Sequence, residues 1–87
     1  MPEKIYMGGV CGMGMAPLAA FMKLDGMDVS GFDDAPNPDT RKMLEEFGVA
    51  IRRAPAGERF DRIVISSALR PRAGELAAEY PGARAQG

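Results

Sequence analysis

The stretch GGVCGMGM, residues 8–15, places four glycines and one cysteine between a predicted strand and a predicted helix. In such a turn, backbone N–H groups and the positive end of the helix dipole meet at one point, which suits a phosphate group. Glycines let an anion approach the backbone and permit dihedral angles that other residues resist. The dinucleotide-binding pattern G-x-G-x-x-G is met at its first and last positions, Gly9 and Gly14, whereas Cys11 occupies its middle position.

An acidic residue follows this glycine loop at the distance that the pattern requires. Asp33 stands 19 positions after Gly14, at the end of the next predicted strand, where its carboxylate would accept hydrogen bonds from a ribose diol. The alternative is that the glycines serve only the close packing of strand and helix, and that Asp33 is a solvated turn residue. The spacing favours nucleotide binding over that alternative without excluding it.

Two serines follow a later predicted strand. Ser66 and Ser67 come directly after the apolar run at 63–65, so in a parallel sheet they share an edge with the glycine loop and Asp33. Ligands of open α/β sheets bind along that edge. Hydroxyl groups also satisfy backbone groups where a strand ends, and the serines alone do not distinguish these roles.

Cys11 is the single cysteine of the chain. A helix N-terminus lowers the pKa of a thiol, but the chain has no histidine to act as its base, so we interpret Cys11 as a small residue fitted to the loop. The lack of histidine also excludes the usual zinc sites and the Ser-His-Asp triad. Met13, Met15 and Met22 are interpreted as core residues, because methionine fills irregular gaps and no cluster of metal ligands accompanies them.

Composition narrows the class of protein. The chain has 87 residues, 26% of them charged, which predicts one ordinary globular domain. The net charge is −1, so the chain lacks the excess of positive charge that is typical of domains that bind long nucleic acids. No apolar run approaches the roughly 18 residues that a membrane span needs. One cysteine and no export signal favour a reducing cytoplasm.

The predicted elements run in the order strand, helix, strand, helix, strand, strand, helix. Asn37 is predicted to cap the helix that begins at Pro38, and Met43, Leu44 and Phe47 to form its buried face. The predicted strands are 3–10, 27–32, 49–53 and 62–66, and the predicted helices are 15–25, 38–47 and 75–80. This order predicts an α/β domain built on a mostly parallel sheet. The tail, residues 82–87, is expected to be unstructured or to be a cut in a longer protein.

Three separated motifs resemble the N-terminal domain of the Mur ligases. They are KIYMGGVCGMGMAPLA, DVSGFD and IVISSALRP, the last followed by EL. These ATP-dependent enzymes add amino acids or peptides to UDP-N-acetylmuramate. The likeness runs from Lys4 to about Glu79 and is greatest to the alanine-adding kind and the tripeptide-recycling kind. It implies that residues 1–87 form a single Rossmann-like, three-layer domain that binds a UDP-sugar and is a fragment of a longer ligase of peptidoglycan synthesis or recycling.

The resemblance also implies a set of contacts. The glycine loop would hold the diphosphate through backbone N–H groups, and Asp33 and Phe32 would lie near the nucleoside. The turn that contains Ser66 and Ser67, called the serine turn below, would line the other side of the binding pocket. The implied substrate-binding residues are Cys11, Gly12, Met13, Gly14, Met15, Phe32, Asp33, Ser66, Ser67 and Ala68. No catalytic residue and no metal ligand is implied in this chain.

ATP and Mg are expected only in the full-length ligase, because the chain holds no G-x-x-x-x-G-K-[ST] loop. The 87 residues alone are not expected to catalyse ligation, and the expected partners are the central and C-terminal ligase domains. Two other functions stay open. One is a dinucleotide module that binds NAD(P) or flavin, since those ligands also present a diphosphate and a ribose. The other is a non-enzymatic domain without a ligand, suggested by departures from the family at Tyr6, Cys11 and Ala73.

Overall fold

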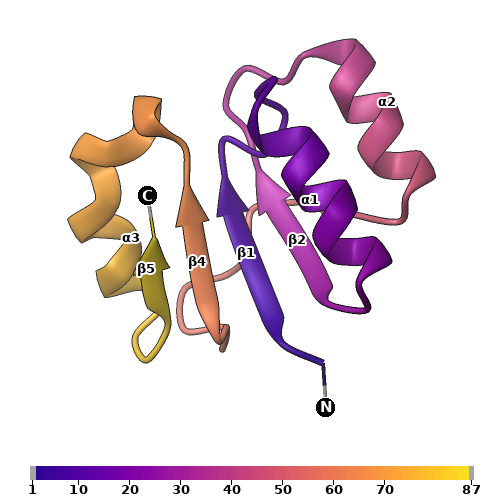
Figure 1. The fold of residues 1–87 in the computed structure, drawn as a ribbon. Coiled ribbons are helices and arrows are strands. Elements are labelled where there is room, and N and C mark those ends of the chain that lie inside the picture. The colour runs from indigo at the N-terminus through magenta and orange to yellow at the C-terminus, as the bar shows by residue number, and fades with distance from the viewer. Residues whose placement is uncertain (1, 87) are drawn as a thin grey trace.

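The computed structural model describes residues 2–86, and it describes only the backbone of Ala68, Arg70, Ala85 and Gln86. Up to residue 79, its strands and α-helices follow one another in the predicted order (Figure 1). They are β1 (Lys4–Gly8), α1 (Met15–Leu24), β2 (Asp28–Phe32), α2 (Pro38–Glu46), β3 (Ala50–Ile51), β4 (Arg62–Ile65), the 3₁₀ helix η1 (Ser67–Arg72), α3 (Ala73–Glu79) and β5 (Arg84–Gln86). The five strands form one sheet in the order β3-β2-β1-β4-β5, with every pair parallel.

Helices cover both faces of the sheet, which confirms the predicted three-layer α/β fold. Helices α1 and α2 lie together on one face, and α3 lies on the other (Figure 1). Each face has its own cluster of buried side chains. The cluster under α1 and α2 contains Ile5, Met7, Val10, Cys11, Ala16, Ala19, Met22, Val29, Leu44, Val49 and Val64. The cluster under α3 contains Tyr6, Phe32, Ala54, Phe60, Ile63, Ile65, Leu76 and Tyr80.

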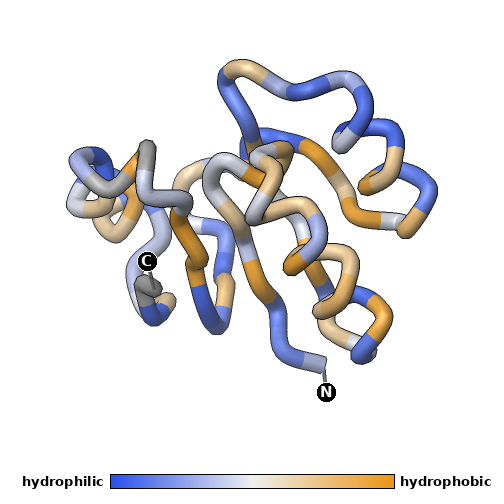
Figure 2. The backbone as a smooth tube through the Cα atoms, turned by 45° about the horizontal axis from the view of Figure 1, so that its top comes forward, coloured by the Kyte–Doolittle hydropathy of each residue, from blue (hydrophilic) through white to orange (hydrophobic). Residues whose placement is uncertain are grey.

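Alternation along β1 explains the two clusters. Ile5 and Met7 pack toward α1, and Tyr6 packs toward α3, because successive side chains of a strand point to opposite faces. The next strand in the sheet, β4, is an apolar run after its first residue (Figure 2). That pattern is typical of a parallel strand covered on both faces.

Local signals in the sequence set the ends of α2. The Asn37 side chain accepts hydrogen bonds from the N–H groups of Asp39 and Thr40, which confirms the predicted cap. Pro38 occupies the first turn, where its missing N–H costs nothing. Gly48 has a φ of +82° just after the helix, a conformation that favours glycine.

Three predictions about the elements were wrong. Residues 84–86 are not unstructured but form β5, which pairs with β4. The third strand is only two residues long rather than five. The 3₁₀ helix η1 was not predicted. Phe47 is 39% exposed and so does not belong to the buried face of α2.

The outer face of α1 is apolar. Leu18, Phe21 and Leu24 are exposed large hydrophobic residues of this helix. None of the helices formed by residues 2–86 is long and apolar enough to cross a membrane.

Candidate functional site

An open pocket lies at the carboxyl ends of β1, β2 and β4. Its volume is about 450 Å³, inside the range of about 300–1,000 Å³ that is common for small-ligand sites. Three loops meet there: the glycine loop after β1, the loop after β2, and the turn that leads from β4 into η1. The residues that line it are Gly9, Cys11, Gly12, Met13, Asp33, Asp34, Ala35, Asn37, Ser66, Ser67 and Leu69. The tertiary structure therefore brings together the three motifs that the sequence analysis singled out.

Gly9 allows the glycine loop to pass close to the serine turn. Its φ is +75°, and a Cβ built on it would lie 2.5 Å from Oγ of Ser66. Its N–H donates to the carbonyl oxygen of Phe32 at 2.9 Å, so the loop begins by pairing with the end of β2. Both the dihedral angle and the neighbouring serine therefore require glycine at this position.

Some backbone N–H groups of the glycine loop donate to protein acceptors and others do not. Cys11 N–H donates to Oδ2 of Asp33 at 3.0 Å. Gly12 N–H donates to the Gly9 carbonyl at 3.0 Å, and Met15 N–H donates to the Gly12 carbonyl at 3.1 Å. Within residues 2–86, the N–H groups of Met13 and Gly14 have no acceptor. Of the five expected phosphate donors from Cys11 to Met15, two are therefore free to bind an anion.

These two free N–H groups lie at the N-terminus of α1. Gly14 is the N-cap residue of this helix, and no side chain caps it. The first turn of α1 contains no acidic residue that would compete with an anion for the helix dipole. A Cβ built on Gly14 would meet no heavy atom within 4 Å, so the space beside this residue is open.

Asp33 anchors the glycine loop in this structure. Besides the N–H of Cys11, its carboxylate accepts the N–H of Ala35 through Oδ1 at 2.9 Å. It thereby ties the loop after β1 to the loop after β2. The contact between Asp33 and a ribose stays a prediction.

Thr40 is a residue of the site that sequence reasoning missed. Its Oγ1 donates to the carbonyl oxygen of Cys11 at 2.6 Å, which fixes the glycine loop from the side of α2. Thr40 lies in the first turn of α2 and is 29 residues from Cys11 in the chain. Only the packing of α2 beside α1 makes this contact possible, so no local pattern signals it.

Cys11 is buried, with 1% of its surface exposed. Burial raises the pKa of its thiol, and the nearby Asp33 carboxylate raises that pKa further. The side chain belongs to the core under α1 and α2 rather than to a reactive site. The interpretation of Cys11 as a small residue fitted to the loop is therefore confirmed.

The methionines near the loop divide between core and surface. Met22 is buried and Met15 packs partly against the core, as predicted. Met13 is 84% exposed, so its interpretation as a core residue was wrong. It lines the pocket, and its own backbone N–H is one of the two free N–H groups.

The serine turn forms the opposite wall. Ser66 N–H donates to the Gly8 carbonyl at 3.0 Å, so the turn continues the pairing of β4 with β1. Ser66 and Ser67 both line the pocket. The predicted contact at Ala68 lies outside the described side chains.

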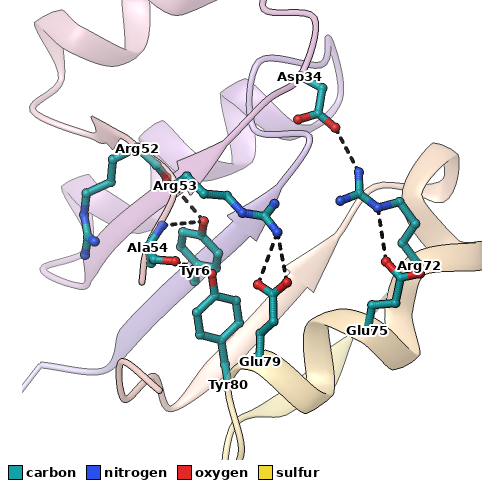
Figure 3. Close-up of polar contacts among 9 residues, drawn as sticks. All are labelled: Tyr6, Asp34, Arg52, Arg53, Ala54, Arg72, Glu75, Glu79 and Tyr80. Carbon is teal, nitrogen blue, oxygen red and sulfur yellow. Dashed lines mark hydrogen bonds and ion pairs between the residues drawn. The ribbon is translucent and has the colours of Figure 1, made fainter. Parts of the chain in front are cut away.

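Phe32 lies beside a second, shallower pocket of about 250 Å³ on the other side of Asp33. Its ring packs under the guanidinium of Arg53, which is 4.5 Å from the ring centroid. Arg53 in turn pairs with both carboxylate oxygens of Glu79 at 3.1 Å (Figure 3). Phe32 is only 4% exposed; it lines this second pocket and is not among the residues that line the first.

Two buried tyrosines hold the segment that carries Arg52 and Arg53. Tyr6 Oη donates to the Arg52 carbonyl at 3.3 Å and accepts the N–H of Ala54 at 2.9 Å. Tyr80 Oη donates to the Ala54 carbonyl at 2.6 Å (Figure 3). The connection between β3 and β4 is therefore fixed against α3 although it has little regular structure.

The fold and the site define a class of protein: a Rossmann-like α/β domain whose glycine loop follows β1 at the switch point of the sheet, between β1 and β4. The sequence profile of the Mur ligase family, catalytic domain, matches residues 4–85. The chain belongs to the Mur ligase family.

Curated relatives agree with this assignment. The chain is 42% identical over 72 residues to a UDP-N-acetylmuramate–L-alanine ligase of Francisella tularensis subsp. novicida, and 40% identical over 72 residues to the enzyme of the same name from Francisella philomiragia. Each match covers 79% of this chain and 16% of the relative, so the chain spans about a sixth of the length of these relatives. No solved structure matches the chain at a significant level.

Proposed function

We infer that this chain is the UDP-N-acetylmuramate-binding domain of a Mur-type ligase of peptidoglycan synthesis or recycling. The observation that carries the proposal is the pair of free N–H groups, Met13 and Gly14, at the N-terminus of α1, where Met13 also lines the pocket. Two adjacent amides and a helix dipole suit one phosphoryl group of a diphosphate. The names of the relatives supply the chemical class of ligand, a uridine diphosphate sugar.

The pocket supports the placement of the rest of the ligand. The diphosphate would lie between the glycine loop and the serine turn, with the hydroxyl groups of Ser66 and Ser67 as further donors. The nucleoside would extend past Asp33 toward the second pocket, which is lined by Phe32 and Arg53.

The remaining steps of a ligase belong to other parts of such an enzyme. ATP and Mg would bind outside this chain, and the central and C-terminal ligase domains would be its partners in a cytoplasmic enzyme. This domain would hold the UDP-sugar and present its carboxylate to them.

Titration with UDP-N-acetylmuramate tests the proposal. We expect saturable heat in calorimetry and chemical-shift changes at the amides of Met13 and Gly14 in a ¹⁵N-labelled sample. NADH serves as the competing ligand, because a dinucleotide module would bind it instead. A folded chain that shows no shift at millimolar UDP-N-acetylmuramate would contradict the proposal.

A further inference from the structure

The charges around the pocket are unfavourable for a diphosphate. Its lining includes the carboxylates of Asp33 and Asp34 but, among the described residues, no lysine or arginine. Asp33 is partly neutralised by the two backbone N–H groups that it accepts. Asp34 has no such backbone partner among the described residues, and its side chain is 68% exposed. Among the described residues, a cation that offsets these charges would have to come from outside this lining.

Arg72 is placed to be that cation. It is the last residue of η1, the segment that also carries Ser67 and Leu69 of the pocket wall. Its Nη1 donates to Oδ2 of Asp34 at 2.9 Å. Figure 3 shows the side chain reaching from the start of α3 toward the loop after β2, so the ion pair connects two loops that border the pocket.

The ion pair can exchange partners at little cost. The Arg72 side chain is 37% exposed, and exposed ion pairs of this kind contribute little to stability. Phosphoryl oxygens are strong partners for a guanidinium, because its planar N–H groups match two of them at once. Glu75 is a second, more exposed partner of this guanidinium, with its Oε2 3.8 Å from Nε of Arg72.

Resting on the proposed function, we propose that Arg72 binds the diphosphate of the ligand and that Asp34 is its competitor within the chain. When the ligand binds, the Arg72 guanidinium leaves the Asp34 carboxylate for phosphoryl oxygens. Asp34 then lowers affinity in two ways, by occupying Arg72 before binding and by repelling the anion. The pair thus sets how strongly the pocket binds diphosphates.

The variants Arg72→Gln and Asp34→Asn of the full chain test this inference, with UDP as the probe in calorimetry at fixed ionic strength. Loss of Arg72 is expected to weaken UDP binding by about tenfold. Loss of the Asp34 charge is expected to strengthen it by about threefold. In the double variant the gain from Asp34→Asn shrinks, because part of that gain is the release of Arg72.

Two control variants remove the same charges away from the pocket. The first is Arg59→Gln, because Arg59 lies at the amino-terminal edge of the sheet, opposite the edge that bears the pocket. The second is Asp25→Asn, because Asp25 lies at the end of α1 that is far from the glycine loop. Both are expected to leave UDP affinity unchanged within about twofold. A second readout is the side-chain Nε–H signal of Arg72, which should shift when inorganic pyrophosphate is added.

The outcomes separate this inference from the proposed function. If the wild type binds UDP and Arg72→Gln binds it equally well, the role of Arg72 is overturned while the proposed function stands. Weaker binding by Asp34→Asn would overturn the role of Asp34. If only Asp34→Asn binds UDP, competition by Asp34 is supported. If neither the wild type nor Asp34→Asn binds UDP or UDP-N-acetylmuramate, both proposals fail.

Discussion

Gly14 offers a direct test of the glycine loop as a diphosphate site. Its φ of −86° and ψ of −26° are open to any residue, and a Cβ there would meet no heavy atom within 4 Å. Neither backbone strain nor packing in the free domain therefore requires glycine. Under the proposed function, the requirement is close approach of a phosphoryl group to the N–H groups of Met13 and Gly14. The substitution Gly14→Ala separates these causes.

The expected effect on binding is large, and the expected effect on stability is small. A hydrogen bond to a charged group contributes about 1.5–3 kcal/mol, so displacing the phosphoryl group from one N–H weakens binding by about 10-fold to 150-fold. Alanine is less favoured than glycine at an N-cap, but it is favoured by the helical backbone angles found here. These effects oppose each other, and we expect the melting temperature to change by less than about 5 °C.

Calorimetry with UDP-N-acetylmuramate, together with a thermal melt of each variant, measures both quantities. Gly74→Ala in α3 is the matched control, because a Cβ there also meets no heavy atom within 4 Å. It should bind the ligand as the wild type does. If Gly14→Ala binds as tightly as Gly74→Ala, the diphosphate does not approach this part of the loop and the reasoning is refuted.

Three further predictions concern the fold that supports the site. Tyr80→Phe removes the donor to the buried Ala54 carbonyl and should cost about 1–3 kcal/mol in the free energy of unfolding, measured by urea denaturation; an unchanged midpoint would show that this bond is dispensable. Hydrogen bonds from Arg52 lower the pKa of Glu58 to about 2 from an ordinary 4.5. Because the folded pKa lies below the unfolded one, Glu58 stabilises the fold above about pH 5 and loses this effect as the pH falls toward 2. The difference in melting temperature between the wild type and Glu58→Gln should therefore narrow as the pH is lowered over that range. Cys11 should react with a thiol reagent at least about tenfold more slowly in the native chain than in urea, since burial raises its pKa and hides it; equal rates would mean that the loop opens freely.

Much of the fold could be predicted because its signals are local. Asn37 and Pro38 fix the start of α2 through bonds within one helical turn. The apolar run of β4 requires cover on both faces, which indicates a parallel sheet. By contrast, β5 has no apolar run of its own and becomes a strand only by pairing with β4. Sequence reasoning missed it for that reason.

The candidate site divides in the same way. The glycine loop, Asp33 and the serine turn could be expected to converge, because the carboxyl ends of neighbouring parallel strands share one edge. Which N–H groups stay free could not be predicted, because Asp33 reaches 22 residues back along the chain to take the N–H of Cys11. The Asp34–Arg72 ion pair joins residues 38 positions apart, one on the loop after β2 and the other at the end of η1.

The sequence by itself determined the order of the strands and α-helices as far as α3, the location of the glycine loop and the family, since each of these depends on residues close together or on motifs of fixed order. The tertiary structure alone decided which backbone donors stay free and which charges border the pocket. The physical reason is that a hydrogen bond or an ion pair forms over about 3 Å, and only folding brings groups from distant parts of the chain within that range.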